Sequence, residues 1–356
     1  MGFLVPLLPL VGWQAAEATG IGLFWWSVPV FIYFVLPIID HLIGEDFENP
    51  HDSQVKQLEA DRFYRWCTYL FLPAQYGMFI WGCWAFTVLD LKLYEQIGLI
   101  ISIGGINGLG INAAHELGHK KPTIERWLSK IILAPVCYGH FYVEHNRGHH
   151  RNVATPEDPA SSRLGESFFA FWPRTVIGSL RSAWRLEAER LQRRNETTIS
   201  LQNHNIQALL ITVALWGGLI ITFGPALIIF LVIQAVYGFS LLEVVNYIEH
   251  YGLKRQKDES GKYVRVQPEH SWNSNHIATN IMLYHLQRHA DHHANPTRRF
   301  QALRHFENAP QLPGGYATMI PLALIPPLWF RIMDKKVYDH YQGDLSLANT
   351  QTLATI

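Results

Sequence analysis

The sequence predicts an all-α, polytopic membrane protein with about six transmembrane helices and a helical, histidine-rich cytoplasmic cap. Three observations predict this class. Several apolar runs reach the roughly 20 residues that a helix needs to cross a bilayer. With six spans, the loops on one side of the membrane contain only Lys92 of the 29 Lys and Arg residues. Half of the 18 histidines lie in four short motifs, and the arrangement places all four motifs on the opposite, basic side.

The first crossing is expected within residues 1–16, which are apolar but short and contain Pro6 and Pro9. A cleaved signal peptide is the alternative, but such a peptide usually begins with basic residues, and this stretch has none. Residues 1–119 are expected to hold four transmembrane helices and to end in the first histidine motif, and residues 206–250 are expected to form a transmembrane hairpin. Apolar length places the five spans after the first at 21–43, 66–89, 97–117, 206–223 and 226–249.

The orientation follows from the basic residues, because Lys and Arg accumulate in cytoplasmic loops. Both termini and every histidine motif are therefore expected in the cytoplasm. The cytoplasmic segments are then residues 120–205, which hold the second motif, and residues 251–356, which hold the last one. Both segments are expected to be mainly helical.

Two further apolar stretches are not expected to cross the bilayer. A crossing at 126–143 would leave His119 and His145 about 30 Å apart on opposite faces, so this stretch is expected to be interfacial or re-entrant. The other, 316–332, contains three prolines, which disfavour a straight span, and is expected to lie on the membrane surface.

Composition excludes several classes of protein. The net charge is zero, so no basic surface of the kind that binds nucleic acid is expected. The three cysteines, Cys67, Cys83 and Cys137, form no C-x-x-C pair, which excludes an iron–sulfur site within the chain, and they are expected to be packed core thiols. The run GLGINA at 108–113 matches a dinucleotide fingerprint but lies in a span with no preceding strand. Gly104, Gly108 and Gly110 are expected to allow close helix packing or to leave space for substrate.

The histidine motifs are HELGH at 115–119, EHNRGHH at 144–150, NYIEHYG at 246–252 and LQRHADHHA at 286–294. In a helix, offsets of three and four residues place side chains on one face, where imidazoles can converge on an ion. The candidate metal ligands are the nine histidines within these motifs: His115, His119, His145, His149, His150, His250, His289, His292 and His293.

The number of histidines bears on the kind of metal site. H-E-x-x-H alone suggests a zinc protease with Glu116 as its general base. A tetrahedral zinc site takes four ligands, so two metal ions fit nine histidines better than one zinc does. Imidazole is a good ligand for iron, zinc, copper and nickel, so the spacing of the histidines does not identify the metal. A metal transporter is the other alternative, although its histidines would line a route across the bilayer.

The motifs HELGHKK, EHNRGHH, NYIEHYG and LQRHADHHA resemble the four histidine boxes of the membrane-bound alkane monooxygenases. The resemblance extends to GEDFENP at 44–50, ATPEDPASSR at 154–163 and HSWNSNH at 270–276, so it covers nearly the whole chain. That family is similar in general design to membrane fatty-acid desaturases and to xylene monooxygenase. A desaturase or another hydrocarbon hydroxylase is therefore the alternative enzyme.

The resemblance implies a nonheme diiron centre, with two iron ions held by the nine histidines, in the bacterial inner membrane with its active site on the cytoplasmic side. It implies hydroxylation of the terminal methyl group of medium-chain alkanes to 1-alkanols, with O2 and electrons that rubredoxin reductase passes on through rubredoxin. The spans that carry His115 and His250 at their cytoplasmic ends are expected to let a linear alkane enter from the membrane lipids and meet the metals with its end.

Residues beside the ligands are expected to support them. Carboxylates commonly accept the second ring N–H of a metal-bound histidine. One residue along a helix turns a side chain by about 100°, so each carboxylate can serve a histidine other than its neighbour. The alternative is ordinary surface charge. Asn246 lies one turn before His250 and is expected to face the metals. The candidate carboxylates are Glu116, Glu144, Glu249 and Asp291.

Outside the nine, His276 and His285 are expected to form hydrogen bonds near the site, and His140 is expected at the membrane interface. Basic residues beside the motifs are candidates for binding an acidic rubredoxin, although topology alone also accounts for them. They are Lys120, Lys121, Arg147, Arg151, Lys254, Arg255, Arg288, Arg298 and Arg299.

Overall fold

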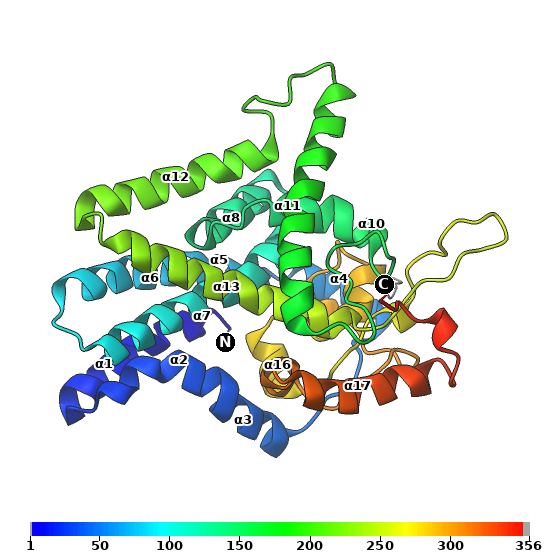
Figure 1. Ribbon diagram of the computed structural model, residues 1–356, viewed down its shortest axis with the longest axis horizontal. Coiled ribbons are helices and arrows are strands. Elements are labelled where there is room, and N and C mark those ends of the chain that lie inside the picture. The colour runs from blue at the N-terminus through cyan, green and yellow to red at the C-terminus, as the bar shows by residue number, and fades with distance from the viewer. Residues whose placement is uncertain (1, 352–356) are drawn as a thin grey trace, which may run out of the picture.

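The computed structural model describes residues 2–351, and the regular structure within that range is helical. The residues described form isolated β-bridges but no strand. The predicted all-α class is confirmed. In Figure 1 most of the long helices run beside one another through the left part of the molecule, one long helix stands upright near the centre, and shorter helices and loops fill the right part.

Four helical segments are long and apolar enough to cross a membrane. They are Gly22–Ile43, α7 (Leu93–Gly118), α12 (His204–Phe223) and α13 (Leu227–His250). These segments agree with the predicted spans at 21–43, 97–117, 206–223 and 226–249. The first is composite, with η2 (Gly22–Trp26), α2 (Ser27–Val30), a π-helical turn η3 (Phe31–Val35) and α3 (Leu36–Ile43).

Two other helical segments correspond to the remaining predicted spans. Residues 2–19 form η1 (Gly2–Leu7) and α1 (Leu8–Thr19), and Gly20, whose φ is 71°, caps the end of α1. The predicted span at 66–89 is divided, because α5 (Arg62–Tyr69) ends before α6 (Phe71–Val88) begins. Six crossings therefore remain a prediction, and four are supported by length and composition.

Helices α7 and α13 pack against each other at the centre of the molecule. A Cβ atom at Gly104 would lie 2.7 Å from the carbonyl oxygen of Gln234, and one at Gly108 would lie 2.7 Å from that of Gly238. Only glycine permits this approach, and small residues are the usual means of close helix packing in membranes. The prediction that these glycines serve helix packing is confirmed.

A buried polar chain joins α6, α7 and α13 between these packed surfaces. The Gln75 amide donates to Asn107 at 3.1 Å, and the Asn107 amide donates to Gln234 at 2.8 Å. The Gln234 amide in turn donates to the carbonyl of Pro135 at 2.7 Å. Hydrogen bonds between polar side chains hold helices together where lipid offers no partner. The chain also fixes the segment around Pro135 against the bundle.

The two apolar stretches that were not expected to span are both broken. Stretch 126–143 consists of α8 (Thr123–Leu133), η4 (Ala134–Val136) and α9 (Phe141–Glu144), with a turn at Cys137, whose φ is 52°. The prediction that Cys137 is a packed core thiol is wrong, because this turn leaves it exposed, whereas Cys67 and Cys83 are buried. The second stretch divides into α16 (Tyr316–Ala323) and α17 (Pro326–His340), since proline begins a new helix.

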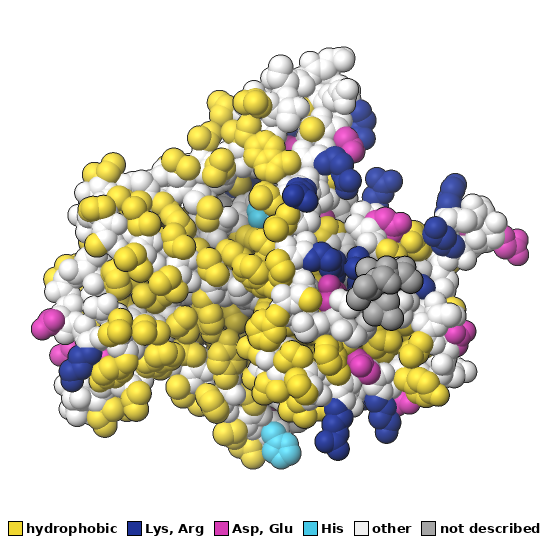
Figure 2. Space-filling view, viewed as in Figure 1, with side chains coloured by type: hydrophobic (Ala, Val, Ile, Leu, Met, Phe, Trp, Pro, Cys, Tyr) yellow, Lys and Arg dark blue, Asp and Glu magenta, His cyan; other side chains and the backbone are white. Residues whose placement is uncertain are grey.

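The remaining elements are short, apart from one long helix that follows the second histidine motif. That helix, α11 (Phe168–Gln192), crosses near the ends of α12 and α13 in Figure 1. Figure 2 shows hydrophobic side chains over the long helices and most of the visible Lys and Arg at the other end of the molecule. The short elements are α4 (Asp52–Ala60), η5 (His145–His149), α10 (His150–Asn152), η6 (Pro268–His270), α14 (Ile277–Met282), α15 (His289–Ala294), η7 (Phe300–Ala302) and η8 (Leu345–Leu347).

Candidate metal centre

The fold brings all nine motif histidines together at one end of the helix bundle, in two adjacent groups. Within each group the candidate ligand atoms lie within 4.8 Å of one another. No cysteine or carboxylate belongs to either group. The five-histidine group consists of His115, His119, His145, His150 and His292. The four-histidine group consists of His149, His250, His289 and His293.

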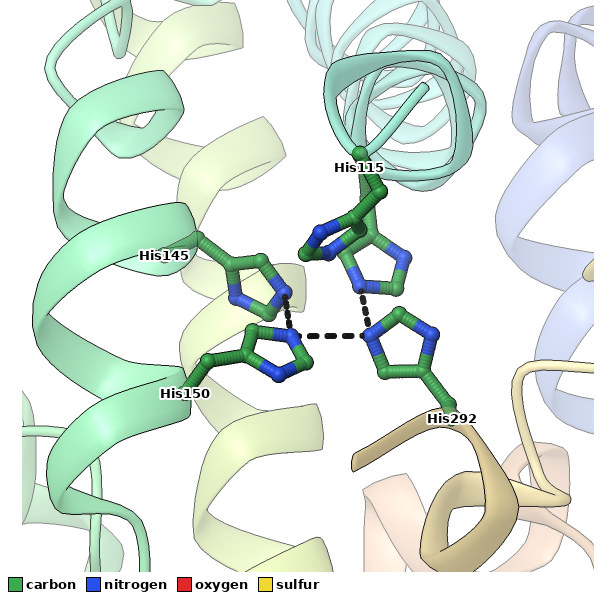
Figure 3. Close-up of side chains that lie close together, drawn as sticks. His115, His145, His150 and His292 are labelled. Carbon is green, nitrogen blue, oxygen red and sulfur yellow. Dashed lines mark hydrogen bonds between the residues drawn. The ribbon is translucent and has the colours of Figure 1, made fainter. Parts of the chain in front are cut away.

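The five-histidine group is assembled from α7, the η5–α10 segment and α15. The Nε2 atoms of His115 and His292 lie 2.9 Å apart, and the Nε2 atom of His150 lies 3.0 Å from that of His292. His145 and His150 are also 3.0 Å apart through Nε2. Figure 3 shows these rings turned toward one another from opposite sides. Four Nε2 atoms therefore converge on one small region.

The four-histidine group lies beside the first and joins η5, α13 and α15. The Nε2 atoms of His289 and His293 are 2.8 Å apart. The ring of His149 is 4.9 Å from that of His250 and 4.9 Å from that of His293. The two groups are in contact, since the rings of His150 and His293 are 4.5 Å apart.

A π-helical turn decides how the second motif is shared between the groups. In an α-helix His145 would pair with His149, four residues later. Residues 145–149 instead form the π-helix η5, whose i to i+5 winding aligns His145 with His150. His149 is thereby turned to the other group. This single turn contributes ligand candidates to both groups.

The chemical state of the imidazoles suits metal binding. Burial lowers the pKa of the histidines outside the spanning helices well below their usual range, so these rings are neutral at pH 7. A metal-binding histidine must be neutral. Within residues 2–351, the Nε2 atoms of His119, His149 and His250 are buried without a hydrogen-bond partner. An unpartnered buried nitrogen is costly, and a metal ion is the partner that an all-imidazole set fits. The histidines with the lowered pKa are His119, His145, His150, His289, His292 and His293.

Two carboxylates contact histidines of the four-histidine group. Asp158 Oδ2 lies 2.9 Å from His149 Nδ1 and also accepts from the Ser161 hydroxyl at 2.6 Å. Glu249 Oε2 lies 3.1 Å from His289 Nε2, and its other oxygen accepts from the Tyr316 hydroxyl at 2.8 Å. Glu249 was a sequence candidate, and it contacts a histidine other than its neighbour. The contact is at Nε2, the nitrogen that faces His293, and not at the second ring nitrogen as expected.

Sequence reasoning missed Asp158. It lies nine positions after His149 in the loop PEDP, and the only signal was that this loop belongs to the stretch 154–163 that resembles the alkane monooxygenases.

The other sequence candidates are buried. Asn246 lines a cavity with His115, His145 and His289, and Glu144 lines a neighbouring one with His145 and His149, whereas Glu116 and Asp291 have other neighbours. The Glu116 carboxylate lies 3.0 Å from Lys120 Nζ, and Asp291 accepts from Arg298 at 2.6 Å, so the structure does not bring either to a motif imidazole. Among the residues described, Glu144 has no hydrogen-bond partner for either oxygen. The Asn246 amide donates to Glu243 at 3.3 Å.

The histidines outside the motifs lie outside both groups. His276 contacts Ser274 at 2.8 Å and Glu45 at 3.4 Å. His285 adopts a positive φ of 54° and packs beside Phe300. His140 lies beside Tyr138, with ring centres 4.3 Å apart.

Two small apolar cavities, of about 50 and 20 Å³, share wall residues and lie between the bundle and the histidines; together they are called the apolar passage. A cavity between α7 and α13 is lined by Gly108 and Leu241, among other residues. It shares Asn112, Leu242, Val245 and Leu286 with a second cavity, which is lined by His115, His145 and His289. The passage therefore ends where the two histidine groups meet.

Several of the cations expected to bind a partner are not available at the surface. Lys120, Arg255 and Arg288 are buried, with exposed fractions of 4%, 6% and 4%. Three others are engaged in ion pairs, Arg147 with Glu187, Arg298 with Asp291 and Arg299 with Glu125. Lys121 and Arg151 are exposed. The predicted basic surface is thus smaller than nine residues.

Comparison with known proteins gives concordant results. The sequence pattern of the family described as fatty acid desaturase matches residues 96–355. The chain is 48% identical to an alkane 1-monooxygenase of Acinetobacter baylyi over 97% of this chain and 86% of that protein. It is 48% identical to an alkane 1-monooxygenase of Pseudomonas putida over 96% and 85% of the two chains. It is 27% identical to the hydroxylase component of a xylene/toluene monooxygenase of Pseudomonas putida, over 94% and 87%.

Proposed function

We propose that this chain, which belongs to the fatty acid desaturase family and to the alkane 1-monooxygenases, hydroxylates the terminal methyl group of medium-chain alkanes with O2 and electrons from a rubredoxin. In that reaction the alkane, O2, two electrons and two protons become a 1-alkanol and water. The observation that carries the proposal is the apolar passage that ends at two all-histidine groups.

The nine histidines are proposed to hold two iron ions, one in each group. The five-histidine group and the four-histidine group each offer enough imidazole nitrogens for one ion, and no thiolate or carboxylate belongs to either. When bound, a redox-active iron pair supplies the oxygen activation that side chains alone do not provide. Imidazole is a ligand that iron accepts.

Neighbouring side chains are proposed to set the orientation of the ligands. The Asp158 carboxylate accepts a hydrogen bond from the Nδ1–H of His149. This contact keeps the ring proton on Nδ1 and leaves the lone pair of Nε2 free to bind a metal ion. Glu249, held by the Tyr316 hydroxyl, stands against His289 where the passage reaches the groups. Both carboxylates are buried, so water does not compete for these contacts.

The shape of the passage is proposed to select the terminal carbon. An alkane has no polar group to orient it, so selection must come from the walls of an apolar channel. The walls are formed by α7 and α13, which carry His115 and His250 at the same end. A chain lying between the two helices presents its methyl end to the histidines.

The histidine end of the molecule is proposed to face the cytoplasm across the bacterial inner membrane. Most of the Lys and Arg in Figure 2 lie at that end, as expected for the cytoplasmic side. The exposed residues Lys121 and Arg151 are proposed to contribute to rubredoxin binding. Charge reversal at Lys121 should lower the rate and its salt dependence, and an unchanged rate would remove this residue from the docking surface.

The experiment that tests the proposed function is product analysis with octane. Purified full-length protein is supplied with iron, O2, rubredoxin and rubredoxin reductase. Terminal C–H bonds are stronger than internal ones, so unguided oxidation would favour 2-octanol and 3-octanol. We expect 1-octanol as the dominant product. An internal alcohol as the main product would contradict the end-on passage, and an absence of any oxidation would contradict the proposed function.

A further inference from the structure

A cavity of about 350 Å³ lies apart from the alkane passage, between α11, α12, α13 and the turn that follows η4. Apolar side chains such as Val176, Leu209 and Phe239 make up most of its wall. Three lining residues, Cys137, Leu180 and Leu209, are exposed and form its mouth. The volume falls within the range of about 300–1,000 Å³ that is typical of small-molecule sites.

Two polar side chains in this wall have unused hydrogen-bonding atoms. Among the residues described, His140 Nε2 and Asn205 Oδ1 are buried without a partner. Burial lowers the pKa of His140 to about 4, so its ring is neutral at pH 7. An unmade hydrogen bond on a buried polar atom is costly, and a ligand that supplies the partner gains that energy. An apolar wall with a few polar atoms is typical of a site for an amphipathic molecule.

The cavity lies next to the metal centre, with a much smaller cavity of about 10 Å³ between them. It shares Tyr138 and His140 with this smaller cavity, which is lined by His145 and His149. That smaller cavity shares His145, Phe141 and Asn246 with the inner end of the alkane passage. Four cavities that share wall residues therefore form a line from the gap between α7 and α13, past the histidines, to the mouth between α11 and α12, and the two cavities beside the histidines are the narrow part of this line.

The two halves of this line differ in polarity. The outer part of the alkane passage is lined almost entirely by hydrophobic side chains and glycine, with Asn112 as the exception. Beyond the histidines the wall includes Glu243, which accepts from the Tyr138 hydroxyl at 2.7 Å and from the Thr175 hydroxyl at 2.8 Å. An alkane gains nothing from polar walls, whereas a 1-alkanol can form hydrogen bonds there.

We propose that the cavity lined by His140 and Asn205 is a binding site for the 1-alkanol product and its exit from the metal centre. The alcohol places its hydroxyl group at these two side chains and its alkyl chain along Val176, Leu209 and Phe239. Substrate and product then use opposite ends of one line of cavities, so that a bound alcohol does not block the next alkane. This inference rests on the proposed function, because that function supplies the alcohol.

Protection of Cys137 tests the binding site without any turnover. Cys137 lines the mouth and is exposed, while Cys67 and Cys83 are buried, so N-ethylmaleimide should label Cys137 selectively. Labelling of the full-length protein is followed by peptide mass spectrometry, with a Cys137→Ala control. We expect 1-octanol to slow labelling in a saturable manner and octane not to slow it.

A substitution at His140 tests whether protection of Cys137 depends on the polar atoms of the cavity wall. His140→Phe keeps an aromatic ring and removes Nε2, which has no partner within residues 2–351. A neutral hydrogen bond contributes about 1 kcal/mol, so the variant should need about fivefold more 1-octanol for the same protection. Equal protection by octane and 1-octanol, or unchanged protection in His140→Phe, would overturn the product site.

Turnover of a matched pair of variants tests the exit. Leu209 and Leu210 are neighbours on α12, and both are 48% exposed, but only Leu209 lines the cavity. Leu209→Trp should retain the yield of 1-octanol in the first turnover and lose rate in later turnovers, whereas Leu210→Trp should behave as the wild type. Equal steady-state rates in the two variants would overturn the exit route. If the wild-type protein does not oxidise octane, the proposed function and this inference both fail. If it oxidises octane normally but octane and 1-octanol protect Cys137 equally, only this inference fails.

Discussion

Replacing Asp158 by asparagine should impair iron binding without changing the shape of the site. The carboxylate uses both of its oxygens as acceptors. Oδ2 faces His149 Nδ1 at 2.9 Å and the Ser161 hydroxyl at 2.6 Å, and Oδ1 accepts from the backbone N–H of Ala160 at 3.1 Å. An asparagine amide must place its NH2 group at one of these two positions.

Either position of that NH2 group loses a contact. At the Oδ1 position it faces the Ala160 N–H, so two donors oppose each other. At the Oδ2 position it favours the tautomer of His149 that carries its proton on Nε2, and a protonated Nε2 cannot bind a metal ion. A buried donor without an acceptor costs about 1–3 kcal/mol. Loss of a group that supports a metal-bound histidine typically lowers metal affinity or activity about 10–100-fold, which corresponds to about 1.4–2.7 kcal/mol. The two magnitudes agree.

The assay for Asp158→Asn is iron retention against a graded chelator, followed by the rate of octane hydroxylation. We expect both to fall by about 10–100-fold. Glu157→Gln is the matched control, because Glu157 is the adjacent residue and is exposed. Wild-type iron retention and rate in Asp158→Asn would refute the assignment of Asp158 as the group that orients His149.

Three further predictions concern the ligands, the pH dependence and the bundle. His250→Ala should lose iron and activity while His51→Ala, which removes an exposed histidine, should lose neither; iron content of the two purified proteins checks this. The metal-free protein should lose stability as pH falls below about 6.5, by about 1.4 kcal/mol per pH unit for each buried histidine that stays neutral, because the unfolded chain then binds more protons than the folded one. Thermal unfolding between pH 8 and pH 5.5 measures this dependence, and a flat profile would contradict the low histidine pKa values. Gln234→Leu should destabilise the bundle by about 0.6–1.7 kcal/mol, the range of interhelical hydrogen bonds in membranes. An unchanged unfolding midpoint would show that the Gln75–Asn107–Gln234 chain does not stabilise the bundle.

The sequence was sufficient to identify which histidines converge but not how they divide. The motifs contain all nine members of the two groups. Their division depends on the π-helical turn at residues 145–149, which pairs His145 with His150 instead of His149. Helical periodicity assumes an α-helix, so it predicts the wrong pair.

Supporting residues were predicted less well because adjacency in sequence does not indicate adjacency in space. Asp158 comes from a loop and reaches His149 through the fold of that loop. Glu116 and Asp291 adjoin ligand candidates in sequence, but their carboxylates pair with Lys120 and Arg298. Apolar length predicted the four long apolar segments within a few residues, because span length is fixed by the bilayer.

The proposed chemistry requires that the two all-histidine groups bind two iron ions. Metal analysis of the purified full-length protein, reconstituted with iron and with zinc in separate samples, tests it most directly, with activity measured on the same preparations. We expect two irons per chain, octane hydroxylation only in the iron sample, and loss of bound iron in His149→Ala and in His292→Ala, which remove one histidine from each group. One zinc per chain in the active protein, with no requirement for iron, would contradict this expectation.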